Sequence, residues 1–208
     1  MNEAATKRAR CARCLRAQSA CICRWIAPVE AEAALLVLQH PLEVGNAKNS
    51  ARLLHLSVAG SALAVGEAFD AAGLDALLHA DGRTPVLLYP DTPGDSALPA
   101  PPPSAPIVAR PAREVRLVVL DATWRKSRKM LYLNPLLQAL PRLALLDVAP
   151  SNYRIRKAHA PHQLSSLEAA ALALGQLEGN GEKFRSLFEA FEGFVEQQAA
   201  FMPHARTA

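Results

Sequence analysis

Four short, mostly apolar segments constrain the fold of this chain most strongly. They span residues 34–40, 84–89, 115–120 and 142–148. Nearly continuous apolar runs of this length are typical of strands that are buried on both faces of a sheet. Segments with helical character separate these runs, so the sequence predicts an α/β fold with a mainly parallel sheet.

Four segments have the composition or spacing of helices, and one long segment is predicted to be a loop. The helical segments are residues 46–58, 123–138 with an interruption near Pro135, 164–177, and 181–201. In the last one, apolar side chains such as Phe184, Leu187 and Phe191 recur at helical spacing, which favours packing on the core or on a second subunit. Residues 90–111 hold half of the 16 prolines and predict an extended loop.

All four cysteines lie close together near the N-terminus, at Cys11, Cys14, Cys21 and Cys23. Four thiolates can close a tetrahedral site around Zn²⁺, and a closed site of this kind is structural. The spacing therefore predicts a small zinc-binding head over residues 1–33, followed by an α/β domain over residues 34–208. An iron–sulfur cluster is the alternative, because four thiolates also suit it.

The cations are concentrated in three segments, although the net charge is only +4. In residues 1–24, 121–130 and 151–162 the only acids are Glu3 and Asp121. Such a distribution fits contact with a polyanion, and it also fits an ordinary solvated surface. No segment reaches the roughly 20 apolar residues of a membrane helix, and the polar N-terminus lacks the apolar middle of a signal peptide. We therefore expect a soluble, cytoplasmic protein without a membrane partner.

Polar residues at the predicted strand ends are the candidate site, because ligands of open α/β sheets bind beyond the carboxyl ends of the strands. Asp121 ends one strand, and it or Thr123 could instead cap the helix that follows. Ser165 and Glu168 have the spacing of a capping box, which leaves Ser166 available to a ligand. His40 also ends a strand, and a structural role is favoured for it.

With these motifs placed, the chain resembles the DTW-domain family of tRNA-uridine aminocarboxypropyltransferases. The resemblance rests on seven motifs in order, which are the four cysteines, His40-Pro41 with Glu43, Asn49-Ser50-Ala51-Arg52-Leu53, Leu88-Tyr89-Pro90, Asp121-Ala122-Thr123-Trp124, Tyr153-Arg154-Ile155-Arg156-Lys157, and Leu164-Ser165-Ser166-Leu167-Glu168-Ala169. Ser50 and Ser166 stand where the family pattern has threonine, and Ala122 stands where glycine is common.

The resemblance implies a SPOUT-like fold whose C-terminal trefoil knot binds S-adenosylmethionine. It also implies transfer of the 3-amino-3-carboxypropyl group from S-adenosylmethionine to N3 of a tRNA uridine, in the variable loop in bacteria. The by-product is methylthioadenosine. By analogy with SPOUT relatives, which are often dimers, the chain is a candidate homodimer.

The same resemblance places site residues on this sequence. Asp121 is the expected catalytic base, with an anchoring role as its alternative. The expected cofactor-binding residues are Leu88, Tyr89, Pro90, Asp121, Thr123, Trp124, Ser165, Ser166 and Glu168. The expected RNA-binding residues are Asn49, Arg52, Arg125, Lys126, Lys129, Arg154, Arg156 and Lys157. Two other functions stay open, a SPOUT-type RNA methyltransferase and a non-catalytic, zinc-stabilised RNA-binding module.

Overall fold

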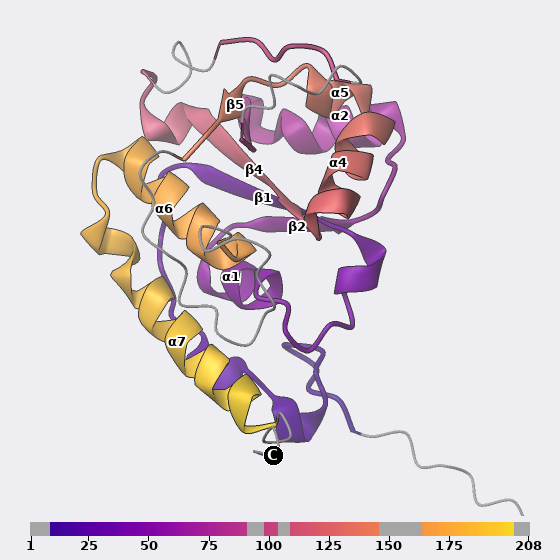
Figure 1. Cartoon of the computed structure of the whole chain (residues 1–208). Coiled ribbons are helices and arrows are strands. Elements are labelled where there is room, and N and C mark those ends of the chain that lie inside the picture. The colour runs from indigo at the N-terminus through magenta and orange to yellow at the C-terminus, as the bar shows by residue number, and fades with distance from the viewer. Residues whose placement is uncertain (1–8, 91–97, 104–108, 146–163, 202–208) are drawn as a thin grey trace, which may run out of the picture.

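A five-stranded parallel sheet forms the centre of the computed structural model, which describes residues 9–90, 98–103, 109–145 and 164–201 (Figure 1). The strand order is β2-β1-β4-β3-β5, and every pair of neighbours is parallel. The strands are β1 (Ala34–Gln39), β2 (Ala62–Val65), β3 (Thr84–Leu88), β4 (Val115–Asp121) and β5 (Arg142–Leu143). The predicted α/β fold is thereby confirmed. The trefoil knot stays a prediction, because residues 146–163 lie outside the described part of the chain.

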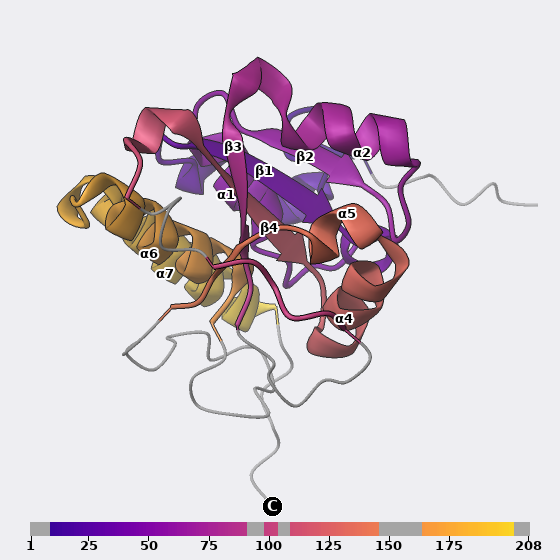
Figure 2. The ribbon, with the colours of Figure 1, turned by 90° about the horizontal axis from the view of Figure 1, so that it is seen from above.

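Helices cover both faces of this sheet (Figure 2). On one face lie α1 (Ala51–Ser57), α6 (Ser166–Glu178) and α7 (Arg185–Ala200), and on the other lie α2 (Ala71–Leu78), α4 (Trp124–Leu133) and α5 (Pro135–Gln138). Successive side chains of a strand point to opposite faces, so each buried strand contributes to both layers. In β1, for example, Leu35 and Val37 belong to the core under α6 and α7, while Leu36 and Leu38 belong to the core under α2 and α4.

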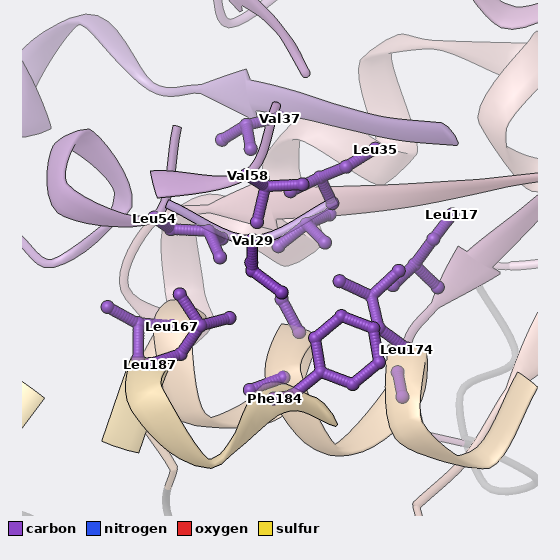
Figure 3. Close-up of a cluster of buried hydrophobic side chains, with 14 of the residues drawn as sticks. Val29, Leu35, Val37, Leu54, Val58, Leu117, Leu167, Leu174, Phe184 and Leu187 are labelled. Carbon is purple, nitrogen blue, oxygen red and sulfur yellow. The ribbon is translucent and has the colours of Figure 1, made fainter. Parts of the chain in front are cut away.

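The larger core lies between the sheet and the α1, α6 and α7 layer (Figure 3). Leu117 of β4 meets Leu174 of α6 and Phe184 there, and all three side chains are fully buried. Burying an aliphatic or aromatic side chain of this size stabilises a fold by about 1.5–3 kcal/mol. This core fixes the position of the α6 N-terminus, which becomes important at the site.

Several predicted helices are confirmed with adjusted ends. The interruption near Pro135 separates α4 from α5, because a residue before proline avoids the helical region and Asn134 has φ −124° and ψ 87°. The segment 164–177 is α6, and the capping box of Ser165 and Glu168 is formed. The segment 181–201 contains a short 3-10 turn, Glu182–Phe184, and then α7.

Three expectations need correction. The helix predicted over residues 46–58 begins only at Ala51, because the side chain of Asn49 accepts a hydrogen bond from the Ala51 N–H and holds a turn before the helix. The sequence predicts no element over residues 59–83, where the structure has β2 and α2. Of the strand predicted over residues 142–148, only Arg142–Leu143 is strand among the described residues. In the proline-rich segment, residues 98–103 carry no helix or strand, as expected.

The described part of the N-terminal head, from residue 9, packs against α7 (Figure 1). Cys14 and Ile22 are buried in the same core as the sheet residues. Trp25 donates a hydrogen bond from Nε1 to Oε1 of Gln197 over 2.5 Å, and Gln197 donates back to the carbonyl of Cys21 over 3.0 Å. The division into a head and a catalytic domain stays a prediction. Within the described ranges, no helix combines the length and the apolar character needed to cross a membrane.

Candidate active site

The acid at the end of β4 is buried beneath two helix N-termini. Because side chains alternate along a strand, Asp121 points to the same face as Leu117 and Val119, which is the face covered by α1 and α6. Gln39 is its register partner at the end of β1 and points the same way. The side chain of Asp121 is therefore enclosed, and the residue is only 3% exposed.

Three side chains donate hydrogen bonds to the Asp121 carboxylate. Oδ2 accepts from Nδ2 of Asn49 at 2.6 Å and from Nε2 of Gln39 at 2.9 Å. Oδ1 accepts from the hydroxyl of Ser166 at 2.7 Å. These donors come from the turn before α1, the end of β1 and the first residue of α6, so the fold itself orients the acid.

Burial raises the pKa of Asp121 above its ordinary value, because the ionised carboxylate has lost most of its water. The three hydrogen bonds from Ser166, Gln39 and Asn49 oppose this effect, while the negative charge of nearby Glu43 adds to it. A carboxylate with a raised pKa is a stronger base than a free aspartate.

A polar pocket opens beside this acid. It encloses about 470 Å³, part of it open to solvent, and its lining includes Glu43, Asn49, Asp121, Thr123 and Ser166. The predicted catalytic acid is thus brought together with two residues predicted for the cofactor and one predicted for RNA.

A second, more apolar pocket lies on the other side of Ala122 and Ser166, which line both pockets. It encloses about 540 Å³ and continues into a neighbouring space of about 620 Å³ through the shared residues Leu88, Tyr89, Pro90 and Trp124. The Tyr89 and Trp124 rings meet edge to face, with centroids 5.9 Å apart and planes at 68°. Trp124 is 48% exposed, so it forms a wall of the pocket rather than part of the core. The apolar lining and the aromatic wall suit a small organic ligand.

Of the two remaining residues predicted to bind the cofactor, one lines the apolar pocket and the other stabilises the start of α6. Ser165 lines the apolar pocket, and its hydroxyl accepts a hydrogen bond from the Glu168 N–H at 3.1 Å. The Glu168 carboxylate accepts from the Ser165 N–H at 2.8 Å, so it completes the helix cap and lines neither pocket. Thr123 occupies the N-cap position of α4, but its side chain makes no capping hydrogen bond, and the Asp121 carboxylate is engaged by Gln39, Asn49 and Ser166 instead.

The residues predicted to contact RNA are not gathered in one place. Asn49 is buried against Asp121, while Arg52 lies on α1 beside the head and donates to the Arg13 carbonyl. Lys126 pairs with Glu43 at 3.2 Å, Lys129 pairs with Glu67 at 2.9 Å, and Arg125 is exposed. Arg154, Arg156 and Lys157 lie outside the described residues.

The four cysteine sulfurs converge in the head. All four Sγ atoms lie within 4.8 Å of one another, and this group could hold a metal ion. Backbone N–H groups of Cys14 and Arg13 lower the pKa of Cys11 to about 6. Burial and the neighbouring sulfurs raise the pKa of Cys23 to about 12.

Two residues that hold or tune the acid were missed in the sequence. Gln39 ends an apolar strand that is the parallel neighbour of β4, so a polar residue at that position was the available signal. Glu43, which belongs to the His40-Pro41 motif but was given no role, is a buried acid four residues beyond the end of β1. His40 has the structural role that was favoured, since Nδ1 accepts from the Leu42 N–H and Nε2 contacts Glu67.

Comparison with known proteins identifies a family and several relatives of this chain. The DTW domain matches residues 8–199. The mouse (Mus musculus) protein tRNA-uridine aminocarboxypropyltransferase 2 is 26% identical over 183 residues, which cover 86% of this chain and 59% of the mouse protein. The Drosophila melanogaster protein of the same name is 29% identical over 191 residues, which cover 87% of this chain and 71% of that protein.

The match spans nearly the whole chain, whereas the chain spans only about three fifths of the mouse relative. No solved structure matches the chain. The matched range contains the cysteine head, the Asp121 site and both helices that cover it. By this match, the chain belongs to the DTW domain family.

Proposed function

We propose that this protein transfers the 3-amino-3-carboxypropyl group of S-adenosylmethionine to N3 of a uridine in tRNA. The observation that carries the proposal is the position of Asp121, a buried carboxylate with a raised pKa at the junction of a polar and an aromatic pocket. The names of the curated relatives supply the reaction type and the tRNA substrate. Such an enzyme would work in the cytoplasm, where its substrate is found.

The proposed chemistry needs a proton acceptor and an aligned leaving group. S-adenosylmethionine supplies an electrophilic γ-carbon and a sulfonium that departs with the electron pair of the broken C–S bond, as neutral methylthioadenosine. Asp121 takes the N3 proton while N3 forms the new bond to the γ-carbon. The Ser166 hydroxyl donates to Asp121 Oδ1 and lines both pockets, so it can pass this proton to the acid.

The aromatic pocket is the proposed place for the adenosine end of the co-substrate. Tyr89 and Trp124 give it faces and edges on which a purine can pack, and Leu88 and Leu143 add apolar surface. The methionine end then points toward Ser166 and Asp121, where the two pockets meet. A knot at the C-terminal end of the sheet, as in SPOUT proteins, would complete this pocket.

In the head, we propose a structural zinc ion held by Cys11, Cys14, Cys21 and Cys23. A tetrahedron of sulfurs about 2.3 Å from Zn²⁺ has edges of about 3.8 Å. The Sγ atoms of Cys11 and Cys23 are 3.6 Å apart, and those of Cys14 and Cys21 are 3.7 Å apart. A multi-iron cluster would spread its cysteine sulfurs farther, because several metal ions and sulfides would lie between them.

A double-label assay tests the proposed reaction. Purified protein is incubated with an unmodified tRNA transcript and S-adenosylmethionine labelled in either the methyl or the carboxypropyl carbons, and the nucleosides are analysed by mass. Carboxypropyl label in uridine supports the proposal. Methyl label in RNA indicates a methyltransferase instead, and the absence of both labels indicates a binding module.

The variant Asp121→Asn separates the base from the anchor role. If Asp121 is the base, transfer falls by at least about 100-fold while the Kd for S-adenosylmethionine measured by calorimetry stays unchanged. If Asp121 anchors the ammonium group of the co-substrate, the Kd rises. Near-normal turnover together with an unchanged Kd would exclude both roles.

A further inference from the structure

A third pocket, lined by arginines, lies between the cysteine head and the turn that follows β1. It encloses about 770 Å³, and Arg10, Arg16 and Arg52 contribute their side chains to its lining. Among the described residues, no Asp or Glu lines it. Two of these arginines come from the head and one from α1, so the pocket exists only because the head docks beside α1.

The three guanidinium groups are held by carbonyl oxygens. Arg16 donates to the carbonyls of Ala47 at 2.5 Å and Asn49 at 2.6 Å, and its guanidinium also lies 5.1 Å from the centre of the Phe194 ring. Arg10 donates from Nε to the Leu15 carbonyl at 2.7 Å, and Arg52 donates from Nη2 to the Arg13 carbonyl at 3.2 Å. A carbonyl orients a guanidinium without cancelling its charge, so the pocket keeps a positive potential.

Arg52 also has an unused donor. Its Nε is buried and has no hydrogen-bond partner in the described part of the chain. A buried donor without a partner is rare in native proteins, and an unseen water or ion is one explanation for it. An anion with several acceptor oxygens would satisfy it, and arginine is the side chain best matched to phosphate.

The arginine pocket is continuous with the candidate active site. It shares Asn46 and Asn49 with the polar pocket of Asp121, which in turn shares Ser166 with the aromatic pocket. The three pockets therefore form one row with an aromatic end, an acid in the middle and a basic end. S-adenosylmethionine is assigned to the aromatic end, so the basic end remains for the second substrate.

We propose that the arginine pocket binds the phosphodiester backbone of the RNA substrate next to the target uridine. This inference rests on the proposed function for the identity of the polyanion. Phosphate contacts fix the register of a nucleic acid, so this docking would direct the neighbouring base toward Asp121. The cysteine head then contributes directly to substrate binding, through Arg10, as well as to stability.

The test measures binding of an unmodified tRNA transcript at several salt concentrations, with the double variant Arg10→Gln/Arg52→Gln. Arg16 is left intact, because it also ties the head to Ala47, Asn49 and Phe194. The matched control is Arg113→Gln, an exposed arginine in the Ala112–Glu114 turn before β4, at the amino end of that strand and away from Asp121. Each lost phosphate contact should lower the slope of log K against log salt by about 0.7–0.9.

We expect the double variant to bind tRNA about 10-fold or more weakly near 0.1 M salt, with a reduced slope and an unchanged Kd for S-adenosylmethionine. Arg113→Gln should bind tRNA as the parent does. If the double variant loses thermal stability, Arg10→Gln alone carries the test, because among the described residues the Arg10 side chain bonds only to the Leu15 carbonyl of its own turn. Unchanged tRNA binding, or an equal loss in Arg113→Gln, would overturn the inference.

The double-label assay distinguishes this failure from failure of the proposed function. Parent protein that transfers the carboxypropyl group while the variants bind tRNA normally would leave the function intact and refute the arginine pocket. Parent protein without transfer activity whose tRNA affinity depends on Arg10 and Arg52 would refute the function and keep the docking site.

Discussion

Asn49 donates from Nδ2 to Oδ2 of Asp121 over 2.6 Å, and so joins the turn before α1 to the end of β4. The backbone carbonyl of the same Asn49 accepts from Arg16 of the cysteine head at 2.6 Å. A continuous set of contacts therefore runs from the head through Asn49 to the acid. The position of the proposed base depends on three parts of the chain that are far apart in sequence.

The raised pKa of Asp121 predicts that this acid lowers the stability of the protein at neutral pH. As the pH rises through the ordinary aspartate pKa of about 3.9 and on through the raised value, the unfolded chain ionises first and the native state loses stability. In Asp121→Asn, the amide oxygen can accept from Gln39 and Asn49 while the amide nitrogen donates to the Ser166 hydroxyl. We expect this variant to gain on the order of 1 kcal/mol at pH 7.5, which is about 2–4 °C in Tm for a chain of this size.

Thermal unfolding at pH 7.5 and pH 4 checks the expectation. The advantage of Asp121→Asn should shrink at the lower pH, which lies near the ordinary aspartate pKa of about 3.9, because less of the carboxyl is ionised there in either state. As a control, Asp121→Ala should be destabilised at both pH values, because it leaves three donors unsatisfied. An equal gain of Asp121→Asn at both pH values would contradict a cost from the buried charge.

Glu43 should tune the pH at which transfer begins. Its negative charge raises the pKa of Asp121, so Glu43→Gln should lower that pKa and extend activity to lower pH. Lys126, which pairs with Glu43 at 3.2 Å, loses its partner in this variant and adds to the same effect. The measurement is the pH dependence of kcat/KM on the acidic side of its optimum. The control is Glu114→Gln, which changes an exposed acid before β4. A shift of this dependence toward higher pH would contradict this account.

The parallel sheet could be predicted because β1, β3 and β4 are almost wholly buried and therefore almost wholly apolar. By contrast, β2 lies at an edge of the sheet and is only partly buried. Its sequence, ALAV, is short and does not alternate between apolar and polar residues, so the sequence does not predict this strand. The start of α1 was misplaced because Asn49 forms a side-chain turn with the backbone, a local competition that apolar spacing does not reveal.

Asp121 and Ser166 could be predicted as site residues, since one ends a buried strand and the other opens a helix after a capping serine. Their mutual hydrogen bond could not be predicted, because it depends on where the larger core places α6. Likewise, Lys126 and Lys129 read as part of a basic run in the sequence, and only the structure reveals the acids Glu43 and Glu67 beside them.

Docking of the head on α7 leaves no room for a side chain at Gly193. A Cβ there would overlap the Cζ3 and Cε3 atoms of the Trp25 ring. We expect Gly193→Ala to cost about 1–3 kcal/mol from overpacking, although alanine favours a helix by up to about 1 kcal/mol. Thermal unfolding measures the loss. Gly181→Ala is the control, because its backbone has φ −67° and its added Cβ meets nothing within 4 Å. Equal stability of the two variants would show that Trp25 is free to move away.

Metal removal should loosen the acid site as well as the head. The four cysteines fix the backbone that carries Arg16, and Arg16 holds the carbonyls of Ala47 and Asn49. A strong chelator should therefore speed hydrogen exchange in residues 9–26 and also in residues 44–50. Exchange in β4 and α6 should change little, because these elements are fixed by the sheet and the larger core.

Exchange measured by mass spectrometry, with and without metal, separates this coupling from general unfolding. The variant Arg16→Gln in its metal-loaded form should reproduce the faster exchange at residues 44–50 without the change at the cysteines. Readdition of Zn²⁺ should restore the parent protein and leave the exchange of Arg16→Gln unchanged. If chelation affects only residues 9–26, the head and the Asp121 site are independent, and the path through Arg16 and Asn49 has no mechanical role.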